Sequence, residues 1–105
     1  MPRLTLPTTL VLLALSRGVR HGFDVLDATG LESGTVYPIL RRLEDGGYVR
    51  SRWEPVREAR DAGRPPRRYY ELTGLGAEAV REALRRHPDA AAVLAPGGVL
   101  RPRQA

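Results

Sequence analysis

Arginine and hydroxyl side chains gathered in two stretches are the groups of this sequence best suited to chemistry. The first stretch supplies Ser33, Thr35, Tyr37, Arg41 and Arg42, and the second supplies Arg64, Arg67 and Arg68. The guanidinium group is a planar fork of N–H donors that fits phosphate oxygens and guanine edges. Hydroxyl groups also donate to phosphate oxygens. Both stretches therefore predict binding of a nucleic acid rather than bond-breaking chemistry.

Residues 34–46 have the spacing of an amphipathic helix. Apolar residues recur at i, i+3, i+4 and i+7, and these are Val36, Ile39, Leu40 and Leu43. The opposite side carries Gly34, Pro38, Arg41, Arg42 and Asp45, with Thr35 and Tyr37 on the flanks. We expect Ser33 to cap this helix and Pro38 to kink it slightly. A helix with one apolar side and one basic, hydroxyl-bearing side is typical of a recognition helix in a DNA groove.

The second basic stretch falls inside a predicted β-hairpin. Residues 48–54 and 67–72 alternate with the period of a strand, and residues 55–66 between them are polar. A connection of this length predicts a mobile loop. Such a hairpin is a candidate wing whose arginines lie along phosphates or enter the minor groove. Four acids flank the cluster and would repel phosphate, namely Glu54, Glu58, Asp61 and Glu71.

Other helices must position these two stretches. Residues 4–17 predict a first helix that is apolar on too many sides to face water. It therefore either forms the centre of the core or is covered in part by a second subunit. Residues 21–26 predict a short second helix, and residues 27–30 predict the turn that follows it.

A last helix is predicted over residues 74–86, with Thr73 as its cap and Ala77, Val80 and Leu84 on its apolar face. Residues 87–105 are rich in Pro and Gly and predict a disordered tail. The expected fold is mainly α with a small β-hairpin. It is a winged helix-turn-helix plus one C-terminal helix, in one domain over residues 1–86.

Composition narrows the class of protein further. The chain has 105 residues, a net charge of +5, no cysteine and two histidines, and all 17 basic residues are arginine. Without cysteine there is neither a disulfide nor a thiolate, and we expect no metal and no cofactor. No apolar run is long enough for a membrane span, so we expect a cytoplasmic protein. Catalytic motifs are missing, so we expect no enzyme.

The positions of three aromatic residues predict different roles. Tyr37 flanks the basic helix face and is a candidate DNA contact. Tyr70 shares a strand face with Leu72, which predicts that Tyr70 lies in the core. Trp53 shares a strand face with Val49, which predicts packing in the core or between subunits. The alternative for Trp53 is a stacking platform for a planar aromatic ligand.

Four segments together resemble the PadR family of transcriptional regulators. They are His21–Val25, Leu31–Glu44, Gly47–Val49 and Gly63–Thr73. The resemblance implies a homodimeric winged helix-turn-helix protein, usually a repressor and often relieved by a small molecule. It assigns DNA binding by the recognition helix to Ser33, Thr35, Tyr37, Pro38, Arg41 and Arg42, and by the wing to Arg64, Arg67 and Arg68. Many relatives continue into longer C-terminal helices, which puts an effector pocket in doubt here.

These observations predict a dimeric repressor that binds double-stranded DNA, with a dimer contact through residues 4–17 and 74–86. A winged-helix module that binds proteins is one alternative, because the acids Glu44 and Asp45 follow the arginine pair. A second alternative is a ligand-sensing regulator with a pocket at the dimer interface, formed by Trp53 and the first helix.

Overall fold

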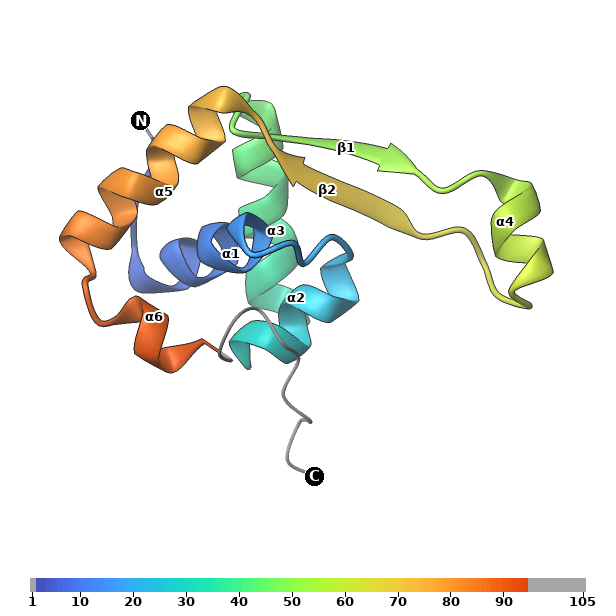
Figure 1. Cartoon of the computed structure of the whole chain (residues 1–105), viewed down its shortest axis with the longest axis horizontal. Coiled ribbons are helices and arrows are strands. Elements are labelled where there is room, and N and C mark those ends of the chain that lie inside the picture. Colours follow the sequence, from blue (N-terminus) through green and yellow to red (C-terminus); the bar gives the residue numbers. More distant parts are fainter. Residues whose placement is uncertain (1, 95–105) are drawn as a thin grey trace.

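The computed structural model describes residues 2–94, which form six helices and one two-stranded antiparallel hairpin (Figure 1). In chain order the elements are α1 (Leu6–Ser16), α2 (Gly22–Thr29), α3 (Ser33–Asp45), β1 (Val49–Trp53), α4 (Val56–Asp61), β2 (Arg68–Leu72), α5 (Gly74–Arg86) and α6 (Ala90–Val93). The predicted fold class is confirmed, and the predicted elements occur in the predicted order, with α4 and α6 in addition. The hairpin projects from the helical body and carries α4 at its far end.

Helix α1 is the centre of the core. Thr5 caps it, because its hydroxyl accepts a hydrogen bond from the Thr8 N–H at 3.3 Å. Every residue from Thr8 to Leu15 is buried, against α2, α3, α5, α6 and β2. Of the two explanations for its apolar surface, the central position in the core is confirmed. The apolar excess of this helix is thus accounted for within one chain and no longer argues for a second subunit.

Helices α2 and α3 form the helix-turn-helix. Helix α2 continues to Thr29, so the turn predicted over residues 27–30 is wrong. Gly30 ends the helix, with φ 73° and its N–H donated to the Leu26 carbonyl at 2.8 Å. The predicted cap of α3 is also wrong, because Ser33 is already its first helical residue and Glu32 occupies the cap position. The predicted apolar face of α3 is confirmed, since Val36, Ile39, Leu40 and Leu43 are buried.

The two strands pair from Val49 opposite Leu72 to Trp53 opposite Arg68. The connection between them was predicted to be a mobile loop, but it contains α4. Six helical residues are too few for apolar periodicity to reveal them. Gly63, with φ 72°, ends the turn of α4 by donating its N–H to the Arg60 carbonyl at 3.0 Å.

The chain after the hairpin returns to α1. The predicted cap of α5 is confirmed, because the Thr73 hydroxyl accepts from the Gly76 N–H. The most buried face of α5 is Gly76, Ala79 and Ala83, whereas the predicted Ala77, Val80 and Leu84 are only half-buried. This face is made of small residues, so the backbone of α5 lies close to the rest of the core.

A tail was predicted from residue 87, but the core extends to Leu94. Ala90 and Leu94 are 1% exposed, and the His87 Nε2 lies 2.7 Å from the Leu4 carbonyl oxygen. Two buried residues were too few to indicate a helix in a segment rich in alanine and proline. The remainder of the predicted tail, residues 95–105, lies outside the described residues.

Candidate nucleic-acid interface

The outward face of α3 is basic, as predicted. Arg41 and Arg42 are exposed, and neither forms an ion pair with any residue in the described range 2–94. Ser33 and Pro38 are exposed on the same helix, and Thr35 is half-buried. The guanidinium groups of Arg41 and Arg42 are therefore available to an external anion.

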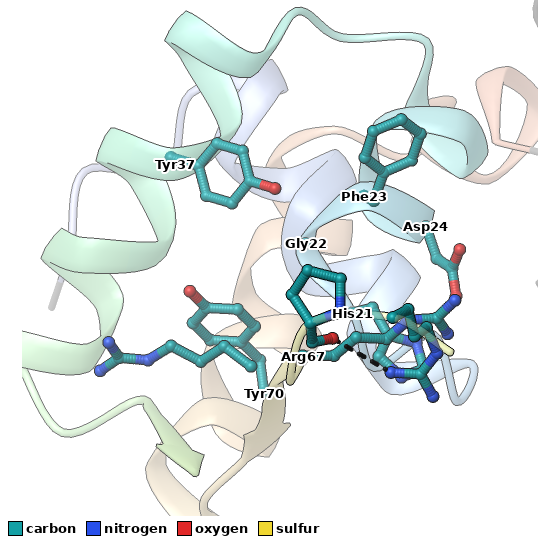
Figure 2. A pocket seen from close by; sticks show the side chains of 10 residues that line it. His21, Gly22, Phe23, Asp24, Tyr37, Arg67 and Tyr70 are labelled. Atoms are coloured by element: carbon teal, nitrogen blue, oxygen red, sulfur yellow. Dashed lines mark hydrogen bonds and ion pairs between the residues drawn. The ribbon is translucent and has the colours of Figure 1, made fainter. Parts of the chain in front are cut away.

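Tyr37 is held in place at the edge of this face. Its side chain is 42% exposed, and its ring lies against the backbone of Gly22 at the start of α2. Figure 2 shows the Tyr37 ring on α3 near Tyr70, which comes from β2. Tyr70 is 9% exposed, which confirms the prediction of a core residue, and burial raises the pKa of its hydroxyl. The α2 backbone thus fixes the Tyr37 ring on one side, and the Tyr37 hydroxyl lies at the edge of the basic face of α3.

Glu44 links helix α3 to the hairpin. Its carboxylate accepts from the Ser51 hydroxyl at 2.5 Å and pairs with the Arg68 guanidinium at 3.4 Å. Arg68 also donates from Nε to the Ser51 hydroxyl oxygen at 2.9 Å. Glu44 therefore faces the hairpin, and its charge is neutralised within the fold. These contacts set the orientation of the hairpin relative to α3.

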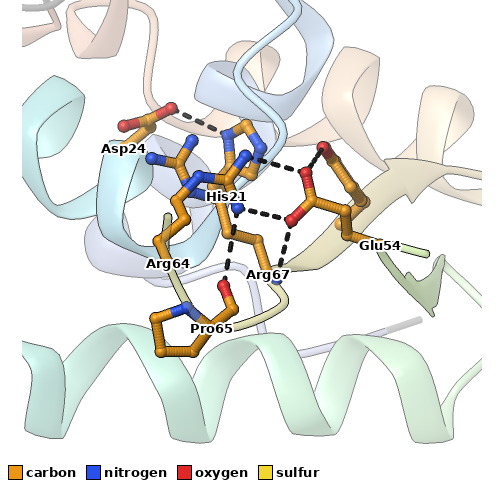
Figure 3. Close-up of polar contacts among 7 residues, drawn as sticks. His21, Asp24, Glu54, Arg64, Pro65 and Arg67 are labelled. Carbon is orange, nitrogen blue, oxygen red and sulfur yellow. Dashed lines mark hydrogen bonds and ion pairs between the residues drawn. The ribbon is translucent and has the colours of Figure 1, made fainter. Parts of the chain in front are cut away.

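The far end of the hairpin is held by an ion pair between Glu54 and Arg64 (Figure 3). Both guanidinium NH2 groups of Arg64 donate to the Glu54 carboxylate, one of them at 2.8 Å. Glu54 is 4% exposed, and it accepts further hydrogen bonds from the Tyr69 hydroxyl and the Arg67 N–H. The donors, Arg64 foremost, lower the pKa of Glu54 from 4.5 to about 2. Glu54 is therefore a buried anchor rather than an acid facing solvent.

The three predicted wing arginines occupy different environments. Arg64 is committed to Glu54, and Arg68 is committed to Glu44 and Ser51, with its guanidinium 5.4 Å from the centre of the Trp53 ring. Arg67 is exposed, and its side chain forms no ion pair among residues 2–94. Of the three, Arg67 is the one whose guanidinium has no competing internal carboxylate. The sequence did not reveal this difference, because it depends on the register of the hairpin and on α4.

A cavity of about 470 Å³ opens between α2, α3 and the return of the hairpin (Figure 2). It is lined by His21, Gly22, Phe23, Asp24, Tyr37, Arg64, Pro65, Arg67, Arg68 and Tyr70. Tyr37 of α3 and the three arginines of the wing thus border one cavity. This arrangement brings together the two stretches that the sequence singled out separately.

His21 and Trp53 have contrasting positions. His21 is the cap residue before α2, and its Nδ1 lies 2.9 Å from an Asp24 carboxylate oxygen. Trp53 is 62% exposed, so its predicted place in the core of the single chain is wrong. Burial along β1 decreases from Val49, which is buried, to Trp53, which is exposed, so the apolar cover of Val49 does not reach residue 53. Packing of Trp53 between subunits stays a prediction.

Metal-ligating clusters and membrane-spanning helices are both missing from the described part of the chain. Residues 2–94 contain no group of three or more His, Cys, Asp or Glu side chains arranged to hold a metal ion. None of the described helices has the length and apolar character that a membrane span requires.

A helix-turn-helix with a basic, exposed second helix, followed by a hairpin that carries arginine, defines the winged helix-turn-helix class of DNA-binding proteins. The model of the transcriptional regulator PadR-like family matches residues 11–82, and the chain belongs to that family. The predicted membership is therefore confirmed, and the protein is a DNA-binding transcriptional regulator.

Solved structures agree with this assignment. A PadR family transcriptional regulator from Eggerthella lenta is 31% identical, with 76% of this chain and 72% of that chain covered and a TM-score of 0.59. A PadR family regulator from Clostridium difficile has 19% identity, coverage of 84% and 96%, and a TM-score of 0.66. A Streptococcus transcriptional regulator has 24% identity, coverage of 78% and 81%, and a TM-score of 0.61. The last two show a shared fold. No curated protein matches the sequence.

Proposed function

We propose that this regulator is a sequence-specific repressor that binds double-stranded DNA as a dimer, with α3 in the major groove. The observation that carries the proposal is the outward face of α3, where Arg41 and Arg42 are exposed and form no ion pair among residues 2–94. Arginine at such a position reads guanine edges or holds nearby phosphates. Ser33, Thr35, Tyr37 and Pro38 complete the contact surface of the helix.

The wing has divided roles in this proposal. Arg67 holds a phosphate beside the groove, because its guanidinium is exposed and unpaired within residues 2–94. Arg64 and Arg68 position the wing through Glu54 and Glu44. Their remaining N–H donors add to the positive potential that the DNA backbone meets. This assignment keeps the three predicted wing residues but orders them by their internal partners.

The alternative of a protein-binding module loses part of its support. It depended on two acids beside the arginine pair, and Glu44 is occupied by Ser51 and Arg68. Asp45 alone remains exposed there. The alternative of a ligand pocket at Trp53 keeps one supporting observation, which is the exposure of the indole ring next to a guanidinium group.

Two experiments test the proposal. Fluorescence anisotropy compares DNA from upstream of the protein's own gene with a scrambled duplex of equal length. A selection from random duplexes finds a preferred sequence that lies elsewhere. We expect a selected or upstream sequence to bind about 10³-fold or more tightly than the scrambled duplex. Equal, salt-sensitive binding to every duplex would contradict sequence-specific recognition and favour the protein-binding module. Sedimentation of the complex tests the dimer, for which two protomers per operator are expected.

A further inference from the structure

A second cavity lies beside α3 on the side away from the hairpin. It measures about 600 Å³ and is lined by Pro2, Arg3, Thr5, Thr8, Ile39, Arg42, Leu43, Gly46 and Tyr48. In Figure 1 the N-terminal segment and the hairpin lie on opposite sides of α3. The helix geometry agrees, because the side chains of Arg42 and Glu44 leave an α-helix about 160° apart, and Glu44 faces the hairpin.

The chemistry of this groove is that of an anion site. Two arginines line it, and its lining includes neither aspartate nor glutamate. Arg3 and Arg42 are exposed, and neither is in an ion pair with another described residue. Thr5 is the cap of α1, whose first turn carries no acid, so the positive end of that helix dipole adds to the field. The groove thus has three sources of positive potential and no internal carboxylate to balance them.

The position of the groove identifies its occupant, if α3 binds DNA as proposed above. The major groove is about 12 Å wide and an α-helix with its side chains about 10–12 Å across, so a seated helix has a sugar–phosphate strand on each side. The hairpin and Tyr37 face the sugar–phosphate strand on one side of α3. The Arg3–Arg42 groove is the surface that faces the other.

We propose that the groove formed by Arg3 and Arg42 seats the DNA backbone strand on the side of α3 opposite the wing. The N-terminal segment then contacts one DNA backbone strand and the wing contacts the other, so that α3 lies between two phosphate contacts. This inference rests on the proposed function and adds to it a residue, Arg3, that lies outside both basic stretches of the sequence.

The test compares Arg3→Gln with Arg81→Gln in the full chain. Arg81 is exposed on α5 and forms no ion pair among the described residues, so both variants lose one exposed charge. Because α5 is part of the predicted dimer contact, sedimentation of Arg81→Gln checks that its oligomeric state equals that of wild type. Anisotropy titrations from about 50 to 200 mM salt report the salt slope, which falls by about 0.9 for each phosphate that the protein no longer neutralises. We expect this decrease per bound protomer for Arg3→Gln, hence about a threefold smaller loss of affinity over that salt range. Arg81→Gln should keep the wild-type slope, and Arg3→Lys should restore most of it.

An Arg3→Gln slope equal to that of Arg81→Gln, with sequence-specific binding intact, overturns this inference and leaves the proposed function standing. A wild-type chain that binds no duplex overturns both. Thermal stabilisation by inorganic phosphate that disappears in Arg3→Gln, without a change in the DNA salt slope, would show a free-anion site and would likewise overturn the inference.

Discussion

The ring of Tyr37 on α3 lies so close to Gly22 on α2 that a larger residue at position 22 would displace the ring. A Cβ on Gly22 would come within 2.6 Å of the Tyr37 Cε1 and 2.9 Å of its hydroxyl oxygen. The two helices of the helix-turn-helix thus meet through a glycine and an aromatic ring. The consequence is that the backbone of α2 sets where the Tyr37 hydroxyl points.

Gly22→Ala is therefore expected to weaken binding to specific and scrambled duplexes alike, because it displaces Tyr37 from the DNA-binding surface proposed for α3. Anisotropy titration measures this effect. A double-mutant cycle with Tyr37→Ala is the control, since the effect of Gly22→Ala on DNA binding should vanish once the ring is absent. An undiminished effect in the Tyr37→Ala background would show that Gly22 acts through another contact.

The Glu54–Arg64 pair predicts a loss of stability in acid. The pKa of Glu54 is lowered from 4.5 to about 2 in the folded chain, chiefly by the hydrogen bond from Arg64. Between these values the unfolded chain binds more protons than the folded one, so the stabilisation is complete above about pH 4.5 and is lost as the pH falls towards 2. Urea unfolding at a series of pH values measures the free energy of unfolding.

Glu54→Gln is the matched variant for this experiment. It should be less stable than wild type at neutral pH, and the difference should shrink as the pH falls through the same range, because the variant has no carboxylate to protonate. A constant difference at every pH would mean that Glu54 does not titrate as the ion pair requires.

Stability and DNA binding should separate between Arg64 and Arg67. Arg64→Ala leaves the buried Glu54 carboxylate without its main partner, so we expect a lower melting temperature. Arg67→Ala removes an exposed guanidinium with no internal ion pair, so we expect unchanged stability and a salt slope lower by about 1 per bound protomer. Thermal denaturation and salt titrations of both variants check this. The reverse pattern would exchange the roles of the two arginines.

Gly76 is a packing position of a different kind. A Cβ there would lie 2.0 Å from the Tyr48 carbonyl oxygen and 2.9 Å from Leu72 Cδ2. Gly76→Ala should therefore destabilise the fold by about 1–3 kcal/mol or more, as overpacking does. Gly74→Ala is the control in the same helix, because a Cβ at Gly74 meets nothing within 4 Å. It should be neutral or stabilising by up to about 1 kcal/mol. Equal effects of the two substitutions in chemical denaturation would contradict the close approach of α5.

The amphipathic elements were predictable from the sequence because burial imposes a visible period. The four buried residues of α3 recur at helical spacing, and its predicted bounds differ from the observed ones by one residue. Residue types alternate along the two strands, and Thr73 is a recognisable cap residue before α5. The resemblance to the PadR family rests on the same segments.

The internal partners of the charged residues were not predictable in this way. Glu54 and Arg64 are ten residues apart and meet because α4 shortens the connection between the strands. Arg3 and Arg42 line one groove because the N-terminal segment lies beside α3, which no local pattern encodes. The exposure of Trp53 was not predictable either. An alternating pattern shows which residues share a strand face, but it does not show whether other elements cover that face.

If α3 reads DNA sequence as proposed, Arg41 contributes to the affinity ratio between a selected operator and a scrambled duplex. This ratio is measured for wild type and Arg41→Ala. We expect Arg41→Ala to lower this ratio by the equivalent of about 1–3 kcal/mol per contact. Arg67→Ala should weaken binding to both duplexes equally and leave the ratio unchanged. A ratio that survives Arg41→Ala and Arg42→Ala, alone and combined, would contradict sequence recognition by this face of α3.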